Sequence, residues 1–157
     1  MPKFKTLDEA YDLCLADGHL RNITELNLEK IRSLAENAQV NLNSANILAR
    51  ALNQQAKEWQ NVYLLHYGAL HLYAEALIYF EKFESPNHQC LFAALCLKYS
   101  HLDLAWDFFE QIRTKRNGVN YYGQHLTYQD WKVIELQTQL YLSALKKELE
   151  KKLAEHK

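Results

Sequence analysis

Apolar residues recur at spacings of three and four along most of this chain, with charged or amide residues between them. That period is typical of amphipathic α-helices. We therefore predict an all-α fold, a single bundle of about five to six helices. The expected helices cover about residues 7–16, 28–52, 58–82, 86–99, 101–116 and 128 onward.

The two longest segments in the first half of the chain are expected to pack as an antiparallel pair. Apolar residues of 28–52 form a heptad seam, and half of them are small enough for close helix approach. The segment 58–82 is apolar nearly all round, which is typical of a helix at the centre of a bundle. Its tyrosines are interpreted as core residues, with a base-stacking platform or a dimer contact as alternatives. They are Tyr63, Tyr67, Tyr73 and Tyr79.

Capping pairs and a few turn-forming residues mark the expected helix ends. Thr6 with Glu9 and Thr127 with Asp130 have the spacing of capping boxes at two helix starts. The remaining boundaries are expected at Gly18, Ser85–Pro86, Ser100 with Asp103, and Asn117–Gly118.

The last helix is predicted to carry one inward apolar face. From Lys146 the sequence becomes rich in Lys and Glu, so this end is expected to project as a solvated helix. The residues expected to face inward are Trp131, Val133, Ile134, Leu136, Leu140 and Ala144.

Length and composition narrow the class of protein. A chain of 157 residues with four glycines and two prolines is expected to form one domain, 1–157. Its formal net charge of −1 creates no global field for nucleic acid, so such binding needs a local basic patch. The most apolar stretch, 62–80, contains His66, His71 and Glu75, which would be costly in lipid. No signal-peptide pattern opens the chain, so we expect a soluble cytoplasmic protein without a membrane partner.

The three cysteines, Cys14, Cys90 and Cys96, show no CxxC spacing and no clustering with histidines. We interpret them as small apolar core residues in a reducing compartment, rather than as a disulfide or a zinc site. No metal ligand set and no cofactor motif is expected.

The segment Arg113–Gly123 concentrates three cations and two tyrosines where a helix is expected to stop. Cations near a helix C-terminus complement its dipole, and Asn-Gly is common in turns, so the segment can be a simple helix end. The same cluster can instead face phosphate, with Arg113, Lys115 and Arg116 supplying the local positive charge.

Arg116–Asn117 followed by Tyr121 resembles the signature of the HEPN family, small helical proteins of which many are metal-independent endoribonucleases. The family's usual motif is an Arg, a polar residue that is often Asn, and a His a few positions later. The resemblance implies a four-helix up-and-down core in which Arg116 holds a phosphate and Asn117 orients it, while Tyr121 stands in the position of the His. It covers about 28–153, with the helix at 6–17 as an addition and 146–157 as a solvated end.

Tyr121 weakens the expected catalysis. Attack by an RNA 2′-hydroxyl needs proton transfer, and histidine titrates near neutrality whereas the tyrosine pKa is about 10. Loss of a well-placed acid–base group costs about 10²–10⁴ in rate. Tyr121 can still hydrogen-bond a phosphate or stack on a base. The other candidate substrate-binding residues are Arg113, Lys115, Tyr122 and His125.

Two more histidines, His66 and His71, lie five residues apart on one predicted helix, a spacing poor for shared metal ligation. We interpret both as hydrogen-bonded core or interface residues.

Three functions remain open. The first is a metal-independent endoribonuclease, a toxin or defence effector paired with an antitoxin. The second is a non-catalytic module that binds RNA, a nucleotide or a nucleotidyltransferase partner. The third is a helical interaction protein whose basic segment only ends a helix. The resemblance also implies a homodimer in which two motif segments form one cleft.

Overall fold

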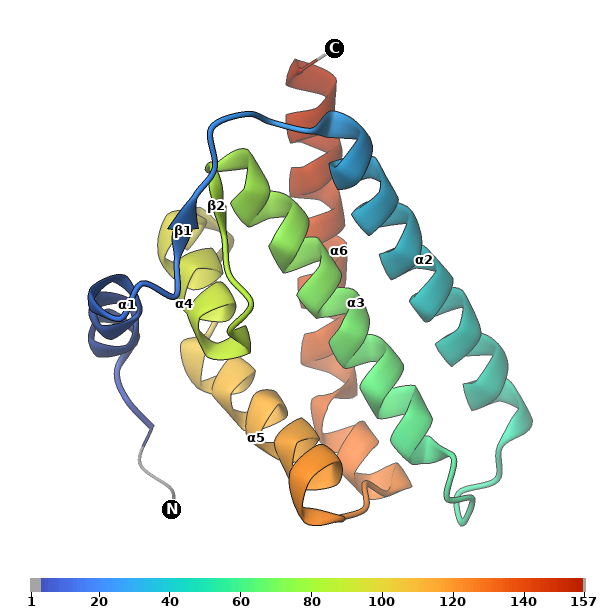
Figure 1. Ribbon diagram of the computed structural model, residues 1–157. Coiled ribbons are helices and arrows are strands. Elements are labelled where there is room, and N and C mark those ends of the chain that lie inside the picture. Colours follow the sequence, from blue (N-terminus) through green and yellow to red (C-terminus); the bar gives the residue numbers. More distant parts are fainter. Residues whose placement is uncertain (1–3, 157) are drawn as a thin grey trace.

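A computed structural model describes residues 4–156, and within them six α-helices form one bundle with a single short sheet (Figure 1). The predicted all-α fold is confirmed. The helices are α1 (Leu7–Ala16), α2 (Leu28–Ala51), α3 (Trp59–Phe80), α4 (His88–Lys98), α5 (Trp106–Tyr122) and α6 (Tyr128–Glu155).

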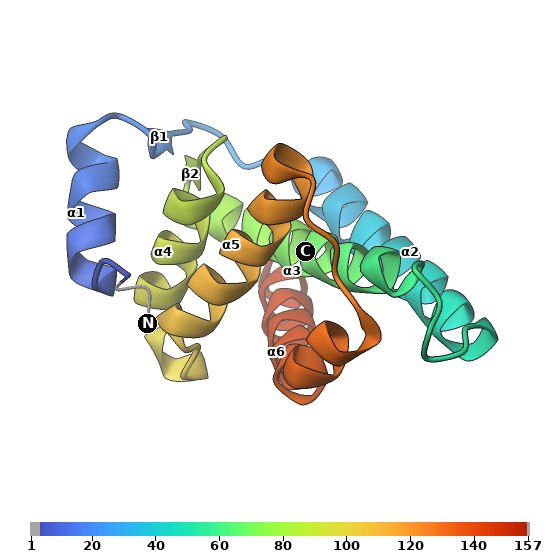
Figure 2. The ribbon, with the colours of Figure 1, turned by 90° about the horizontal axis from the view of Figure 1, so that it is seen from below.

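Helix α3 lies at the centre of the bundle, as its apolar sequence predicted. It packs against α2, α4, α5 and α6. Seen from below, α2 lies on one side of α3, α4 and α5 lie on the other, and α6 covers a further side (Figure 2). Successive long helices α2, α3, α5 and α6 alternate in direction (Figure 1). The side chains of Tyr63, Tyr67 and Tyr73 are buried in this core.

The antiparallel pairing of α2 with α3 is also confirmed (Figure 1). Ile31, Ala38 and Ala45 of α2 are completely buried along the predicted seam. A Cβ atom added to Gly68 of α3 would lie 3.0 Å from the Asn41 side-chain nitrogen. The small residues therefore allow the close approach of the two helices that the sequence indicated.

A two-stranded sheet was not predicted. Strand β1 (Arg21–Asn22) pairs antiparallel with β2 (Phe83–Glu84). It joins the link after α1 to the link between α3 and α4. Strands of two residues are too short to show an alternating pattern of apolar and polar residues, so periodicity cannot predict them.

Two predicted helix starts were wrong. Helix α4 begins at His88, because Asn87 is the N-cap and its side-chain oxygen accepts from the Cys90 N–H at 3.0 Å. Ser85 instead accepts from the Asn87 N–H. At the next boundary, a 3-10 turn η1 (Ser100–Leu102) precedes α5, and its C-cap Asp103 has a φ of 54°. The true start of α5, at Trp106, has no side-chain cap that a capping pattern could reveal.

The predicted helix end at Asn117–Gly118 was wrong as well. Helix α5 continues to Tyr122, and Gly123, with a φ of +66°, ends it in the left-handed region. Gly118 is buried inside the helix, and a Cβ there would collide with the Gln124 side chain. This glycine therefore makes room for the chain that folds back after the helix, where the Gln124 N–H donates to the Gly118 carbonyl at 3.0 Å.

Two helix starts that capping pairs predicted are confirmed. Thr6 with Glu9 and Thr127 with Asp130 both form capping boxes, at the starts of α1 and α6. Gly18, with a φ of +72°, follows the end of α1 as expected.

The inward face of α6 was predicted only in part. Val133, Leu136 and Leu140 are 74%, 75% and 60% exposed, so placing them in the core was wrong. The three exposed residues recur at helical spacing, as the buried residues of α6 do. The sequence alone therefore shows two possible apolar faces. The other face packs on α3, next to the contact of Tyr141 with Phe108 and Phe109 of α5. Ala144 is half-buried. The residues that α6 buries are Trp131, Ile134, Thr138, Leu142, Leu145 and Leu149.

Burial of Leu149 shows that α6 stays packed beyond Lys146, whose ammonium donates to Gln39 of α2 at 3.3 Å. The solvated end was therefore expected too early. No helix within residues 4–156 combines the length and the apolar character needed to cross a membrane.

Candidate functional site

The Arg116 side chain lines a cavity of about 290 Å³ where four helices meet. Arg116 lies on α5, six residues before the helix end, and is half-buried. Helix α3 supplies one wall, because residues 64, 67, 68, 71 and 72 share a face at helical spacing. The lining residues are Asn41, Leu64, Tyr67, Gly68, His71, Leu72, His88, Arg116 and Asn120.

The Arg116 guanidinium carries a charge that no carboxylate within residues 4–156 neutralises by an ion pair. Its Nη1 donates to the side-chain oxygen of Asn117 at 3.2 Å. Its central carbon lies 5.6 Å from the centroid of the Tyr67 ring, within cation–π range. Both contacts orient the guanidinium and leave its charge available to an anion.

Two histidines lie in the same cavity. His88, the first residue of α4, places its Nδ1 2.8 Å from the Tyr67 hydroxyl. The ring of His71 on α3 lies 4.0 Å from the His88 ring, centroid to centroid. Nδ1 of His71 is 2.7 Å from a carboxylate oxygen of Glu75, while its Nε2 is buried and has no hydrogen-bond partner among residues 4–156.

The electrostatics of this cluster keep His88 neutral. Burial, together with positive charge on His71 and Arg116, lowers the pKa of His88 to about 4, whereas the Glu75 carboxylate opposes the shift. Burial also raises the pKa of the Tyr67 hydroxyl, which therefore keeps its proton. The cavity at neutral pH thus contains a fixed guanidinium, an uncharged imidazole and a phenol.

Both histidines that were predicted as core or interface residues are hydrogen-bonded, and His66 is the more buried of the two. His66 is buried and its Nδ1 lies 2.7 Å from the Val62 carbonyl, and burial lowers its pKa. His71 instead lines the Arg116 cavity.

Three other predicted site residues lie apart from this cavity. Lys115 projects toward a different cavity, where its ammonium is 3.9 Å from Asp130. Tyr122 is 77% exposed on the surface. His125 lines a further cavity between the α2–α3 and α5–α6 links.

Tyr121 is 70% exposed and does not line the cavity. Asn117 reaches the site through its hydrogen bond to Arg116. Of the three residues predicted as catalytic, Arg116 lines the cavity, Asn117 contacts Arg116 without lining it, and Tyr121 lies outside it.

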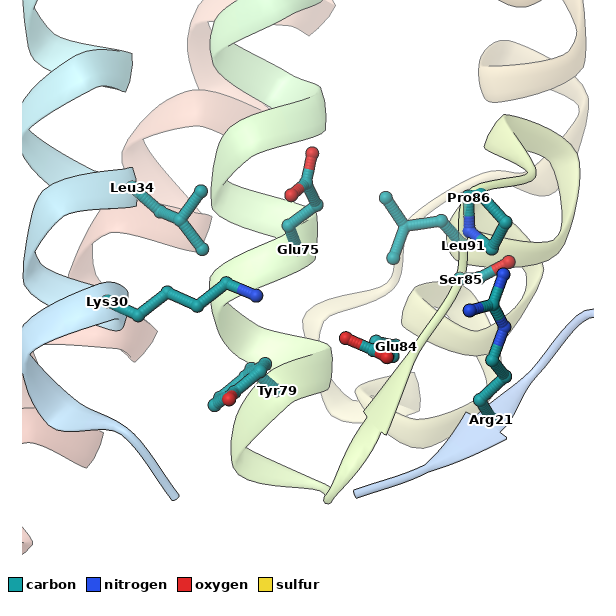
Figure 3. Close-up of a pocket in the computed structure, with 9 residues that line it drawn as sticks. All are labelled: Arg21, Lys30, Leu34, Glu75, Tyr79, Glu84, Ser85, Pro86 and Leu91. Carbon is teal, nitrogen blue, oxygen red and sulfur yellow. The ribbon is translucent and has the colours of Figure 1, made fainter. Parts of the chain in front are cut away.

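A second cavity of about 230 Å³ lies farther along α3, between α2 and the β2–α4 link (Figure 3). Lys30 and Arg21 enter it from opposite sides, and Glu75 and Glu84 point into the space between them (Figure 3). The Lys30 ammonium lies 4.8 Å from the centroid of the Tyr79 ring. The two cations of this second cavity face the two carboxylates. The second cavity therefore lacks the surplus positive charge of the Arg116 cavity.

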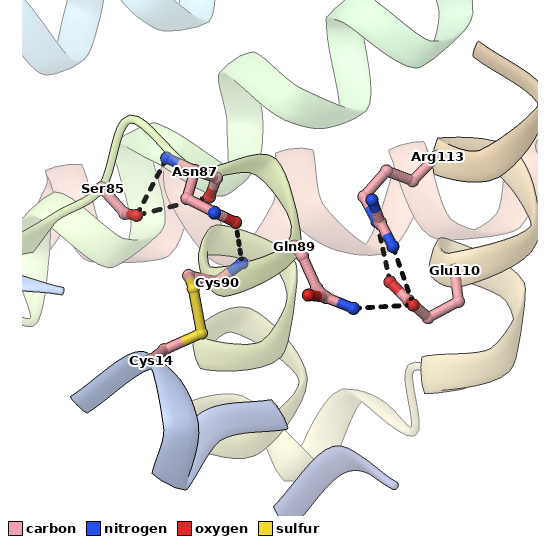
Figure 4. Close-up of a disulfide and its surroundings, with 7 residues drawn as sticks. All are labelled: Cys14, Ser85, Asn87, Gln89, Cys90, Glu110 and Arg113. Atoms are coloured by element: carbon pink, nitrogen blue, oxygen red, sulfur yellow. Dashed lines mark hydrogen bonds and ion pairs between the residues drawn. A yellow bond between two sulfur atoms is a disulfide. The ribbon is translucent and has the colours of Figure 1, made fainter. Parts of the chain in front are cut away.

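Arg113, predicted to bind substrate, is held by a buried carboxylate (Figure 4). Its Nε and Nη2 donate to the two oxygens of Glu110 at 2.9 and 3.0 Å. Glu110 is only 2% exposed and also accepts from the Gln89 side chain at 2.9 Å. Arg113 is therefore paired with Glu110, and Glu110 in turn joins α5 to α4 through Gln89. The charge of Arg113 reaches the cavity only at a distance.

The prediction of three free cysteines was wrong. Cys14 of α1 and Cys90 of α4 form a disulfide, with their Cα atoms 5.7 Å apart, whereas Cys96 is a buried free thiol (Figure 4). The two residues are 76 positions apart, so only the packing of α1 on α4 brings them together. Cys90 lies in the first turn of α4, two residues after His88. Disulfides persist in oxidising compartments, so this bond does not support the predicted cytoplasmic location, which stays a prediction.

One local spacing in the sequence could have indicated part of this site. His71 and Glu75 are four residues apart, a spacing at which helical side chains pair. His88, Tyr67 and Asn120 gave no such sign, because their meeting with Arg116 depends on how α3, α4 and α5 pack.

Within residues 4–156 no group of three or more His, Cys, Asp or Glu side chains is arranged to hold a metal ion. Comparison of the chain with models of protein families, with curated proteins and with solved structures found no match.

Proposed function

We propose that the Arg116 cavity binds a phosphate group of single-stranded RNA or of a nucleotide. The observation that carries this proposal is a half-buried guanidinium at the wall of a cavity, which forms no ion pair in the part of the chain that the structure describes. A planar guanidinium binds two phosphate oxygens at once, and partial burial strengthens that interaction.

The other lining residues suit a nucleotide ligand. The Asn120 amide and the His88 imidazole offer further hydrogen-bonding groups, and Tyr67 offers an aromatic wall. A cavity of about 290 Å³ lies at the small end of ligand sites, which suits one nucleotide unit rather than a duplex. Recognition of single strands through phosphate contacts and aromatic side chains is common among RNA-binding proteins.

The resemblance to HEPN proteins supports the same ligand, because Arg116 and Asn117 occupy the phosphate-facing positions of that motif. The toxin or defence role, the antitoxin or nucleotidyltransferase partner and the homodimer stay predictions of that resemblance.

The test is binding of a fluorescein-labelled single-stranded RNA with 2′-O-methyl sugars, which cannot be cleaved through the 2′-oxygen. Fluorescence anisotropy would compare the wild-type protein with Arg116→Ala over a range of salt concentrations. Arg32→Ala, which removes an exposed arginine of α2 outside the cavity, is the matched control.

We expect Arg116→Ala to weaken binding about tenfold or more and to reduce the salt slope by about one. Arg32→Ala should bind like the wild-type protein. Equal losses in the two variants would show that only diffuse charge attracts the RNA, and the proposed site would be excluded.

A further inference from the structure

We propose that His88 is the general base of an RNA-cleaving site, and that the Tyr67 hydroxyl positions it. This inference rests on the proposed phosphate site at Arg116. The base would come from α4, outside the Arg116–Tyr121 segment in which the sequence resemblance places the catalytic histidine.

The geometry of His88 suits this role. Its Nδ1 is held by the Tyr67 hydroxyl at 2.8 Å, so Nε2 is the ring nitrogen left for a ligand. When the Tyr67 hydroxyl donates, Nε2 carries the single ring proton, and when His88 donates through Nδ1, Nε2 is an acceptor. The second arrangement is the one that can take a proton from a hydroxyl group.

A further contact restricts the His88 ring, and a second contact supports the first. The His71 ring covers it at a centroid distance of 4.0 Å, and the Glu75 carboxylate in turn fixes His71 through Nδ1. A ring held on two sides has one orientation in which to meet a substrate bound to Arg116, and such preorganisation favours catalysis.

The charges around His88 come from two helices. His71 and Glu75 belong to α3, while Arg113 and Arg116 belong to α5, and Arg113 is already paired with Glu110. Burial, aided by these cationic neighbours, lowers the pKa of His88, so the ring is unprotonated at neutral pH, which is the form a base requires. A bound phosphate would offset the charge of Arg116 and make His88 more basic when the substrate is present.

The reaction is an internal transfer within RNA. Nε2 of His88 takes the proton of the 2′-hydroxyl, the 2′-oxygen bonds to phosphorus, and the bond from phosphorus to the 5′-oxygen breaks. The departing oxygen takes a proton from water, and His88 returns its proton to the hydroxide so formed. Arg116 stabilises the charge on the phosphoryl oxygens. The products are a 2′,3′-cyclic phosphate and a free 5′-hydroxyl, without any change in oxidation state.

The experiment follows cleavage of a short labelled RNA by the full chain, with EDTA present, and identifies the ends by mass spectrometry. It compares the wild-type protein with His88→Gln, Tyr67→Phe and His71→Gln. The control is His19→Gln, an exposed histidine outside the cavity. Binding of the 2′-O-methyl RNA is measured on every variant, so that binding and cleavage are separated.

We expect His88→Gln to lose about 10²-fold or more in rate while it keeps affinity for the 2′-O-methyl RNA. The rate at low substrate should fall with acid around the His88 pKa of about 4, and His71→Gln should move that fall to higher pH. Tyr67→Phe should lower the maximal rate more than it weakens binding, as expected for a positioning residue.

Cleavage by His88→Gln at the wild-type rate would overturn the inference. So would a wild-type protein that binds the 2′-O-methyl RNA and leaves the cleavable RNA intact, and the phosphate site would then stand alone. A wild-type protein that fails to bind either RNA would overturn the proposed function together with this inference.

Discussion

Removing the disulfide between Cys14 and Cys90 should destabilise the protein without unfolding it. The bond closes a loop whose ends are 76 residues apart, and the chain-entropy relation for a loop of that length gives about 4 kcal/mol. Domains of this size have about 5–15 kcal/mol in total. Helix α1 would keep its remaining contacts with α4, which include the buried side chain of Ala10, and the Trp106 indole would still donate to the Lys5 carbonyl. A folded but weakened protein is therefore expected.

Urea unfolding followed by tryptophan fluorescence would compare oxidised wild-type protein with the Cys14→Ala/Cys90→Ala double variant. Alkylation of the denatured, unreduced wild-type protein should label Cys96 alone, and reduction should expose all three cysteines. The reasoning fails if the unreduced protein is labelled at three positions, or if the two proteins differ by less than about 1 kcal/mol.

Three more perturbations test the packing around the site, each by urea unfolding. Arg113→Ala should cost about 3 kcal/mol, because it leaves the buried Glu110 carboxylate without its cation, whereas the exposed Arg32→Ala should change stability by less than about 0.5 kcal/mol. Thr127→Ala should cost about 1 kcal/mol by removing the capping box of α6, and no loss would contradict that geometry. The free energy of unfolding should fall as pH decreases from about 6.5 toward 4, since His66 and His88 have lowered pKa values and the unfolded chain takes up protons that the folded protein does not. A stability that is flat over this interval would show that both histidines titrate normally in the folded state.

The sequence predicted the features of the fold that depend on local spacing. Helical periodicity located α1, α2 and α3, and the apolar character of α3 placed it at the centre. Capping boxes marked the starts of α1 and α6, because a cap is a contact between residues three positions apart.

Features that depend on packing were predicted poorly. Gly118 reads as a helix end, yet it lies inside α5 because the chain after the helix must pass close to it. Val133 and Leu136 form an apolar stripe as regular as the one that is buried, and only contact with α3 and α5 distinguishes the two.

The candidate site shows the same contrast between residues close in sequence and residues brought together by packing. Arg116 was found because three cations lie within four positions of the sequence. His88 was missed, since the contact with Tyr67 joins residues 21 positions apart on two helices. The disulfide was missed for the same reason, at a separation of 76.

The most direct test of the phosphate site is an NMR titration of the His88 imidazole in the presence of a ribonucleoside monophosphate. If the phosphate binds at Arg116, the His88 signals should shift on addition of the nucleotide and the His88 pKa should rise from about 4, and both effects should disappear in Arg116→Ala. His88 signals that ignore the nucleotide, or that respond equally in Arg116→Ala, would contradict the account.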